Sequence, residues 1–321
     1  MAVQGLRRKA RDDKPFAVMV PDLATARALC RLDRTAEATL LSPRRPIVLA
    51  TRRPGAGLAP AVAPGLPERG VFLPYSPLHH LLMDAVGRSL VLTSGNLSDE
   101  PIAHEDDEAF VRLGPIVDAL LTHDRPIQIR CDDSVVRATV STAGATSRVQ
   151  AVRRSRGYAP EPLPLPTPAR RQVLAVGAEL KNTVSVAKGS AVVVSHHIGD
   201  LEHLVEHRSF HQAVAHLCQL YGVTPEVVAH DLHPEYLSTK FALDLDLPGL
   251  AVQHHHAHIA SCLVEHRHTD WVLGIAFDGL GFGLDGTLWG GEFLVADHAA
   301  PRPPTRSILA GSMADCSWIP S

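Results

Sequence analysis

The stretch VQHHHAHIASCLVEH (252–266) decides how the second half of this chain folds. The apolar residues after the histidines repeat at helical spacing, which predicts a helix with the histidines on its first turn. These apolar residues are Ile259, Ala260, Leu263 and Val264. His254 and His258 are four positions apart, so their Cβ atoms lie about 6 Å apart on one helix face. This spacing suits two ligands of one ion.

The stretch WVLGIAFDGLGFGLDGTLWGGEF (271–293) follows this helix and predicts a buried strand, a tight glycine turn and a second strand. We expect the turn to carry Asp278. Imidazoles together with a carboxylate favour Zn²⁺ or Fe²⁺. The alternative is a histidine-rich helix start that only faces solvent, but an acidic residue in a glycine-rich turn favours an ion or phosphate site. We therefore predict a metal site formed by His254, His258 and Asp278.

Composition sets limits on the class of protein. The chain has 321 residues, of which 45% are hydrophobic and 20% charged, with a net charge of −3. This length allows two domains with separate cores, and this charge gives no general reason to expect nucleic acid as a partner. The five cysteines are scattered, which is typical of reduced thiols. No signal peptide or membrane-spanning run is recognisable, so we expect a cytoplasmic protein with no membrane partner.

The first half contains two candidate anion sites. A basic cluster runs into the strand PFAVMV, and the strand Leu90–Thr93 ends in Ser94-Gly95-Asn96. Converging cations, hydroxyls and exposed backbone N–H groups hold phosphates, although a solvated edge and an ordinary turn are the common alternatives. The prediction takes Lys9, Arg11, Lys14, Ser94 and Asn96 as one group, with Arg154 and Arg156 as further cations before a proline-rich linker.

The second half predicts three strands in a row and then helix-strand-helix-strand-helix. Two apolar strands flank Gly177–Lys181, and a third follows a hairpin at Lys188-Gly189. This βββαβαβα order is that of one ribonuclease-H-like half, and a second run of strands opens at Trp271. In such folds the glycine turns after the first strand of each lobe face phosphates, so Gly177–Lys181 and Asp278–Gly283 are the candidate turns.

Taken together, these motifs resemble the HypF family of carbamoyltransferases. The first half is similar to a YrdC-type domain through RRKARDDKPFAVM, LPYSPLHHLL, LVLTSGNLSDEPI, HDRPIQIRCDDSVVR and RRSRGYAP. The second half is similar to a TsaD-like (ASKHA-type) domain through GAELKNT, SHHIGDLE, HDLHPEYLST, VQHHHAHIASCL and DGLGFGLDGTLWGGEF. We therefore expect an α/β protein with a YrdC-like twisted sheet (1–160), a proline-rich linker (161–171), a ribonuclease-H-like lobe with the start of a second lobe (172–297), and an unrelated tail (298–321).

The resemblance implies a two-site reaction. Carbamoyl phosphate and ATP, with Mg²⁺, would give carbamoyl-adenylate at a first site, and the carbamoyl group would then move to the C-terminal cysteine of a HypE-like acceptor. The first site would use Lys9, Arg11, Lys14, Ser94, Asn96, Arg154 and Arg156. At the second site the resemblance implies Zn²⁺ or Fe²⁺ on His254, His258 and Asp278, with Lys181 and Asp278 catalytic and Lys181, Gly281 and Gly283 at the nucleotide.

The sequence also departs from the family pattern. It lacks the family's acylphosphatase-like and zinc modules, the first strand and helix of the YrdC-type domain, and most of the second lobe. We expect both domains to be incomplete, and we do not expect this chain alone to carbamoylate HypE. Two other classes stay open: a YrdC-type threonylcarbamoyl-adenylate or RNA-binding protein, and an inactive remnant that binds a partner or a metal.

Overall fold

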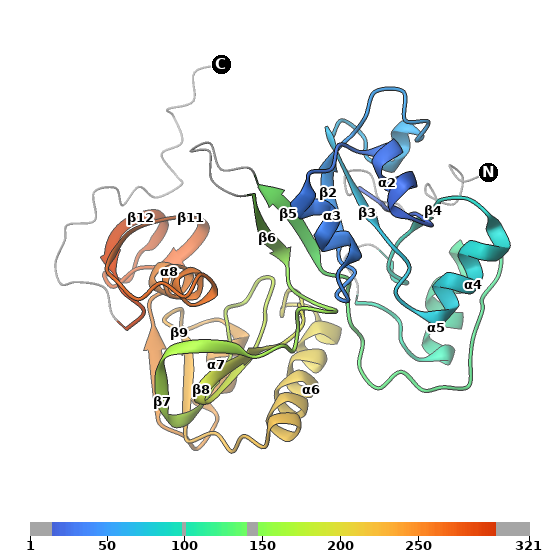
Figure 1. Ribbon diagram of the computed structural model, residues 1–321. Helices are drawn as coiled ribbons and strands as arrows, with labels where there is room; N and C mark the ends of the chain where they lie inside the picture. Colours follow the sequence, from blue (N-terminus) through green and yellow to red (C-terminus); the bar gives the residue numbers. More distant parts are fainter. Residues whose placement is uncertain (1–14, 98–100, 140–146, 300–321) are drawn as a thin grey trace. The chain divides into compact units, whose positions relative to one another are not determined.

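The computed structural model of the protein describes residues 15–97, 101–139 and 147–299. The chain forms two compact units, Met1–Pro160 and Glu161–Ser321. Each unit has its own strands and helices (Figure 1), and buried apolar residues form a core in each. The predicted α/β class is confirmed.

The first unit contains a six-stranded mixed sheet with strand order β4-β1-β3-β2-β5-β6. Its strands are β1 (Ala17–Met19), β2 (Ile47–Thr51), β3 (Glu68–Phe72), β4 (Leu90–Leu92), β5 (Val135–Thr139) and β6 (Arg148–Arg153). Its helices are α2 (Leu23–Leu29), α3 (Arg34–Leu41), α4 (Pro77–Val86) and α5 (Asp106–Leu113), with short 3₁₀ turns at Pro60–Val62 and Gly114–Ile116. Helix α5 ends directly before Gly114-Pro115, because proline cannot donate a helical hydrogen bond.

Alternating residues of this sheet pack into two separate hydrophobic cores, one on each face. Val18 and Val71 pack with buried residues of α2 and α3, while their neighbours Met19 and Phe72 pack on the other face with Met83 of α4. This is the period-two pattern of a strand that is buried on both faces. The helices on the first face begin where aspartates accept backbone N–H groups, Asp22 for α2 and Asp33 for α3.

The second unit contains a four-stranded sheet, order β10-β9-β7-β8, and a separate two-stranded hairpin. Its strands are β7 (Leu163–Ala175), β8 (Ser185–Val194), β9 (Val227–Asp231), β10 (Gly249–Val252), β11 (Val272–Phe282) and β12 (Leu288–Ala296). Its helices are α6 (Leu204–Tyr221), α7 (Leu237–Leu243) and α8 (His254–Glu265). Strands β7, β9 and β10 are parallel, and β8 is antiparallel to β7. Buried residues of the sheet pack against α6 and α7 around Phe210.

Two predictions for this unit are corrected. Residues 163–171, expected as a linker, form the first part of β7, and β8 runs without a hairpin through Lys188-Gly189. The longer β7 pairs with β8 on both sides of Lys188-Gly189: Leu163 pairs with Val192, and Ala169 pairs with Gly189 at a shift of register. The glycine, at φ +57°, therefore sits in an irregular strand rather than at a chain reversal. Strand β9 pairs with β7 only at Val173–Ala175, so the prolines of β7 lie where one edge is open.

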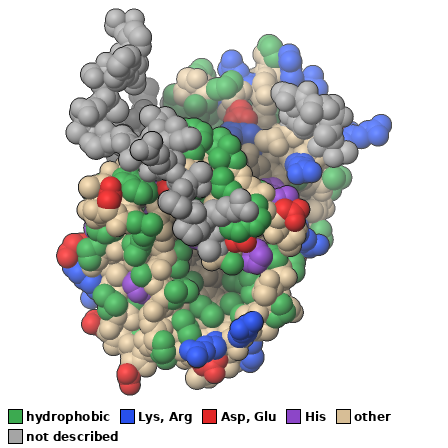
Figure 2. All heavy atoms as spheres, turned by 90° about the vertical axis from the view of Figure 1, so that its left-hand side faces the viewer, with side chains coloured by type: hydrophobic (Ala, Val, Ile, Leu, Met, Phe, Trp, Pro, Cys, Tyr) green, Lys and Arg blue, Asp and Glu red, His purple; other side chains and the backbone are tan. Residues whose placement is uncertain are grey.

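The hairpin β11–β12 has one face on α8 and one face exposed. On β11, Leu273, Ile275 and Phe277 are 64%, 53% and 77% exposed, whereas Gly274 and Ala276 between them are buried. Figure 2, which views the side where β11 and β12 lie in Figure 1, shows hydrophobic side chains at the surface. Because the strand alternates, the buried positions are the ones that contact α8.

Candidate metal and nucleotide site

The candidate site lies where three parallel strands end. Strand β7 leads into the loop Gly177–Thr183, β9 ends in Asp231, and β10 leads directly into His254 at the start of α8. The carboxyl ends of parallel strands share one edge of a sheet, which is where α/β folds bind ligands. A pocket of about 920 Å³ opens there and is lined by residues from all three strand ends.

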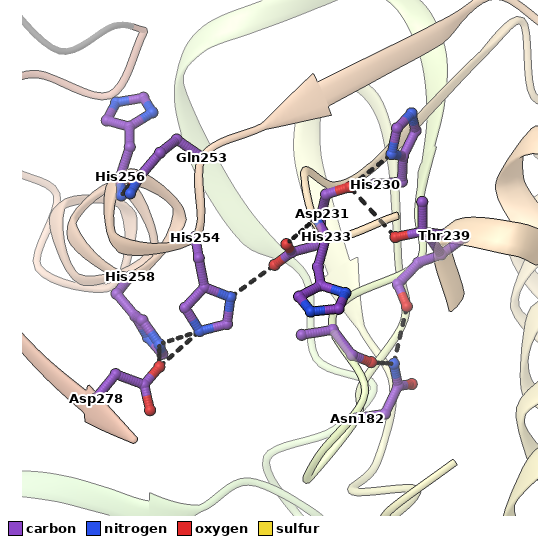
Figure 3. Close-up of polar contacts among 12 residues, drawn as sticks. Asn182, His230, Asp231, His233, Thr239, Gln253, His254, His256, His258 and Asp278 are labelled. Carbon is purple, nitrogen blue, oxygen red and sulfur yellow. Dashed lines mark hydrogen bonds and ion pairs between the residues drawn. The ribbon is translucent and has the colours of Figure 1, made fainter. Parts of the chain in front are cut away.

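The three predicted metal ligands meet in this pocket. His254 Nε2 lies 2.6 Å from Oδ2 of Asp278, and His258 Nε2 lies 3.1 Å from the same oxygen. The two Nε2 atoms are 3.2 Å apart. Figure 3 shows both rings turned toward Asp278, and the ligand atoms of the three residues all lie within 4.8 Å of one another. The predicted grouping is therefore present in the structure.

Asp278 reaches the histidines from a bulge and not from the predicted glycine turn. It lies inside β11, where the register with β12 shifts between Phe277 and Gly281. The chain reverses later, at Gly283–Gly286, where Gly283 and Thr287 share a hydrogen bond. Extra residues in one strand push the backbone out of the ladder and redirect a side chain. The bulge thus presents Asp278 to α8 while the strands pair on both sides of it.

A fourth residue, Asp231, supports the group and was not assigned a role from sequence. Its Oδ2 lies 2.6 Å from Nδ1 of His254, and its Oδ1 accepts the backbone N–H of His233 at 2.8 Å. The Asp231 side chain is almost fully buried. A carboxylate on Nδ1 keeps the proton there and leaves Nε2 for a ligand bond. Its position at the end of a strand next to β10 was the available signal.

Charge in the site suits a divalent cation. The hydrogen bond to Asp231 raises the pKa of His254 against the opposing effect of burial. Burial acts to raise the pKa of Asp278, yet hydrogen bonds from Gly279 N–H and from the two histidine rings lower it overall. Two imidazole nitrogens and a carboxylate are a ligand set of zinc and of non-haem iron sites. The residues present therefore fit such an ion.

The loop Gly177–Thr183 forms the opposite wall of the pocket. Lys181, predicted to be catalytic, lines the pocket and has φ +49°, an uncommon conformation for a residue with a side chain. Its backbone N–H donates to Asp200 at 2.6 Å. Glu179 also lines the pocket; burial raises its pKa, and the N–H of Leu237 donates to its carboxylate. The loop therefore brings one cation and one carboxyl group to the ligand space.

The side chain of Asn182 fixes this loop. It is 1% exposed and donates to the carbonyls of Val176 and Ala178 at 2.9 and 2.6 Å. Gly177 has φ +67°, and a Cβ there would lie 2.4 Å from the Thr183 carbonyl oxygen. Only glycine fits so close an approach of two backbone segments. The loop is thus tied across its base by one amide side chain.

Two predicted nucleotide contacts have other surroundings. Gly281 is in β11, where a Cβ would lie 2.5 Å from His255 Nε2, and Gly283 faces the ring of Trp289. The pocket lining instead includes Gly279 and Leu280 from this strand. The absent side chains at Gly281 and Gly283 thus make room for neighbouring rings.

In the first unit the structure describes some of the predicted phosphate-binding residues. Ser94 Oγ and Asn96 Oδ1 are 2.7 Å apart in the turn after β4. Arg154 lies over the ring of Tyr158, with Cζ 5.8 Å from its centroid. Lys9, Arg11 and Lys14 lie outside the described residues, so their convergence on Ser94 and Asn96 stays a prediction.

Arg156 is engaged by its own unit. Its guanidinium donates to Asp133 at 2.9 Å and to the carbonyls of Arg44 and Arg45 at 3.0 and 2.9 Å. Its Cζ also lies 3.3 Å from the centroid of the Tyr75 ring. These contacts use donors and a face of the group that a phosphate would need. The geometry favours a structural role.

Family comparisons cover both units. Residues 168–265 match the HypF Kae1-like domain, 274–303 match the second subdomain of the carbamoyltransferase Kae1-like domain, and 2–155 match the Sua5/YciO/YrdC family described as telomere recombination. The carbamoyltransferase HypF of Rhizobium leguminosarum bv. viciae is 46% identical over 298 residues, which are 91% of this chain and 38% of the relative. The chain belongs to the HypF family.

Other HypF proteins agree with this membership. HypF of Synechocystis sp. is 44% identical over 295 residues, 91% of this chain and 38% of that protein. A crystal structure of full-length HypF in its phosphate- and nucleotide-bound form is 45% identical with a TM-score of 0.86 and covers 94% of this chain and 39% of that one. The chain thus spans about 38% of the length of the curated relatives.

Membership of the HypF family confirms the resemblance and sets aside the free-standing YrdC-type alternative, because one chain matches both the YrdC-type and the HypF Kae1-like families. The family match reaches residue 303, somewhat beyond the boundary expected at 297. Among the described residues, no helix has the length and apolar character needed to cross a membrane.

Proposed function

We propose that this chain takes part in carbamoyl transfer of the HypF type. In this proposal carbamoyl phosphate is hydrolysed to carbamate and phosphate, and the carbamate reacts with ATP and Mg²⁺ at the first unit to give carbamoyl-adenylate and pyrophosphate. At the pocket of the second unit, the thiol of the C-terminal cysteine of a HypE-like acceptor protein then takes the carbamoyl group, and AMP leaves. The named relatives are carbamoyltransferases, and a solved HypF structure is described as phosphate- and nucleotide-bound.

One observation carries the proposal for the second unit. His254, His258 and Asp278 face the same pocket as the Gly177–Thr183 loop. A phosphate held by that loop and a carbonyl oxygen held near the histidines would be neighbours. Holding both reactants in one cleft is what a group-transfer site requires.

The residues of this pocket have distinct roles in the proposal. A divalent ion, Zn²⁺ or Fe²⁺, held by His254, His258 and Asp278 would supply Lewis-acid polarisation of the carbamoyl carbonyl. Asp231 keeps a proton on Nδ1 of His254. The Lys181 ammonium neutralises phosphate charge, and the rigid loop fixes where that phosphate sits.

The first unit is proposed to bind ATP through hydroxyl, amide and cationic groups. Ser94 and Asn96 stand together at the end of β4, and Arg154 is the described cation assigned to the same role. Lys9, Arg11 and Lys14 complete the proposed set. Arg156 is left out of it, because its guanidinium already binds Asp133 and two carbonyls.

The test measures transfer directly. A HypF relative in which this chain replaces the matching segment is mixed with carbamoyl phosphate, ATP, Mg²⁺ and a HypE protein, because the chain alone is not expected to carbamoylate HypE, and HypE is then weighed by mass spectrometry. The expected result is an adduct on its terminal cysteine that His258→Ala abolishes and His266→Ala leaves intact. His266 is a matched control because it is an exposed histidine at the end of the same helix.

The result that overturns the proposal is an acceptor without adduct. If the chain then still binds Zn²⁺ and ATP, a partner- or metal-binding role replaces transfer. Titration of Zn²⁺ into the chain and into His258→Ala separates the two readings, because equal binding by both excludes the metal site as well.

A further inference from the structure

The metal ligands come from two elements that pack against each other. His254 and His258 are on α8, whereas Asp278 is on β11. The distance between the histidine nitrogens and the carboxylate therefore depends on how closely the helix approaches the strand. Helix and strand surfaces approach as closely as the side chains between them allow.

Two glycines of β11 permit a close approach. A Cβ at Gly281 would lie 2.5 Å from Nε2 of His255, and a Cβ at Gly274 would lie 2.6 Å from Cγ1 of Ile259. Both distances are shorter than real side chains tolerate. The ring of His255 and the side chain of Ile259 thus occupy the places that side chains on β11 would take.

The two helix residues that pack over these glycines each lie directly after a metal ligand in the sequence. His255 directly follows the ligand His254, and Ile259 directly follows the ligand His258. Asp278 lies between the two glycines on β11. Each helix ligand is thus followed by a residue whose side chain packs over a glycine of β11, and these two glycines lie on either side of Asp278 in the sequence. We call the space beside Gly281 that the His255 ring fills the Gly281 socket.

His255 is the more constrained of the two seated residues. Its side chain is 0% exposed, and its Nδ1 lies 3.4 Å from Oε2 of Glu292 on β12. Glu292 Oε2 also accepts from Nε2 of Gln253 at 3.3 Å, and Gln253 caps the start of α8. The Nε2 atom of His255 is buried over Gly281 and, among the described residues, has no hydrogen-bond partner. The ring is therefore fixed from both strands of the hairpin and cannot turn away at low cost.

We propose that Gly281 is a positioning residue of the metal site, whose missing side chain receives His255 and so sets α8 at the distance from which His254 and His258 reach Asp278. The inference deepens the proposed function, since it rests on metal binding by these three residues. It also gives Gly281 a different role from the phosphate contact that its glycine-rich sequence suggests.

The test compares two glycine-to-alanine variants of the full chain. Gly281→Ala places a methyl group against the His255 ring. Gly249→Ala is the matched control, because its Cβ would meet the ring of His230 at 3.4 Å, an ordinary contact. Co²⁺ is titrated into each protein and followed by its visible absorption, which reports affinity and ligand geometry. We expect Gly281→Ala to weaken Co²⁺ binding roughly 10-fold or more and to change the spectrum, as displacement of supporting groups does at metal sites. Gly249→Ala should match the wild type.

The same substitution in a His255→Ala variant distinguishes an effect through the His255 ring from a direct effect on the metal ligands. In His255→Ala the obstacle to a methyl group at position 281 is gone, so Gly281→Ala should cost less Co²⁺ affinity there than in the wild type. Equal Co²⁺ binding by Gly281→Ala and the wild type overturns the proposal. An equal loss with and without the His255 ring also overturns it, because the methyl group would then act on something other than that ring.

Hydrogen–deuterium exchange keeps the test independent of the metal. Gly281→Ala should speed amide exchange in α8 and β11 of the metal-free chain, and His255→Ala should reduce that effect. If the wild-type chain binds no Co²⁺, the metal site of the proposed function is wrong, but the rate of amide exchange still tests the packing of His255 against Gly281. Unchanged amide exchange in Gly281→Ala would then contradict that packing role.

Discussion

Nδ1 of His254 lies 2.6 Å from Oδ2 of Asp231, on the side of the ring opposite Asp278. The ring is thus held between two carboxylates, of which Asp231 is buried and lies at the end of β9. Donation from Nδ1 to Asp231 leaves Nε2 as the ligand atom and fixes the plane of the ring. The strand that precedes α7 therefore contributes to a site whose ligands are all on later elements.

The first prediction is that Asp231→Asn weakens metal binding. The amide retains an oxygen for the N–H of His233 but presents an NH₂ group to Nδ1 of His254, which favours the tautomer with the proton on Nε2. Loss of such a supporting carboxylate typically costs about 10- to 100-fold in affinity. Zn²⁺ titration by calorimetry measures the loss, and Asp246→Asn is the control because Asp246 is exposed. Wild-type affinity in Asp231→Asn would show that the tautomer is fixed by other groups.

The second prediction concerns pH. The hydrogen bond to Asp231 is the main reason that the pKa of His254 is raised in the folded, metal-free chain. The unfolded value is about 6.5, so the associated stability is fully present below that pH and is lost as pH rises through the folded pKa. Zn²⁺ needs an unprotonated Nε2, and its apparent affinity should therefore rise about tenfold per pH unit until that pKa is passed.

Two measurements check the pH prediction. The difference in melting temperature between the metal-free wild type and Asp231→Asn should shrink as pH rises through the folded pKa, because the wild type alone loses this contribution. Zn²⁺ affinity of the wild type should increase over the same range. A pH-independent difference in melting temperature, or Zn²⁺ affinity that rises toward acid, would contradict the assigned protonation state.

The third prediction is that Arg156 stabilises the first unit. Arg156→Met removes the hydrogen bonds to Asp133 and to the carbonyls of Arg44 and Arg45. It also leaves the half-buried carboxylate of Asp133 without its cation. We expect a loss of about 2–3 kcal/mol in the free energy of opening of β2 and β5, measured by hydrogen exchange. Arg148→Met, at an exposed position of β6, should change it little. A variant that weakens ATP binding and leaves exchange unchanged would restore the phosphate role.

The three metal ligands can be recognised from the sequence, whereas Asp231, which supports one of them, cannot. His254 and His258 are visible because a helix puts residues four apart on one face, and Asp278 because it is acidic in a glycine-rich stretch after an apolar strand. Asp231 is 23 positions from the ring that it contacts, and only the adjacency of β9 and β10 brings them together. That adjacency is a property of strand order, which local spacing does not encode.

The same limit applies to residues whose surroundings differ from those that their local pattern suggests. Arg156 stands in an arginine-rich segment that suits phosphates, but its partner Asp133 is 23 positions earlier and meets it only in the folded unit. Gly281 stands in a run of glycines typical of a turn, whereas the space beside it is filled by His255 from another element. The proline-rich segment was expected to be a linker because prolines lack a donor, yet it pairs with β8 along one edge, while β9 leaves its other edge open. In each case tertiary contacts overrode a local pattern.

The last prediction is that Asn182→Asp disorders the loop that faces the ligand space. The amide of Asn182 donates to the carbonyls of Val176 and Ala178, and a carboxylate can donate to neither. It would place a buried charge against two carbonyl oxygens, which costs about 2–4 kcal/mol in the free energy of opening of this segment. Lys181 would then lose its fixed place in the pocket. We expect faster amide exchange at residues 177–183 and weaker binding of AMP, the nucleotide part of the adenylate, to the second unit, measured by calorimetry with Zn²⁺ affinity as an internal reference, because the metal ligands lie on α8 and β11. Gln212→Glu makes the same chemical change at an exposed position of α6 and should leave all three quantities unchanged. If Asn182→Asp binds AMP as the wild type does while the loop exchanges faster, the phosphate is held elsewhere in the pocket and the loop has no part in binding it.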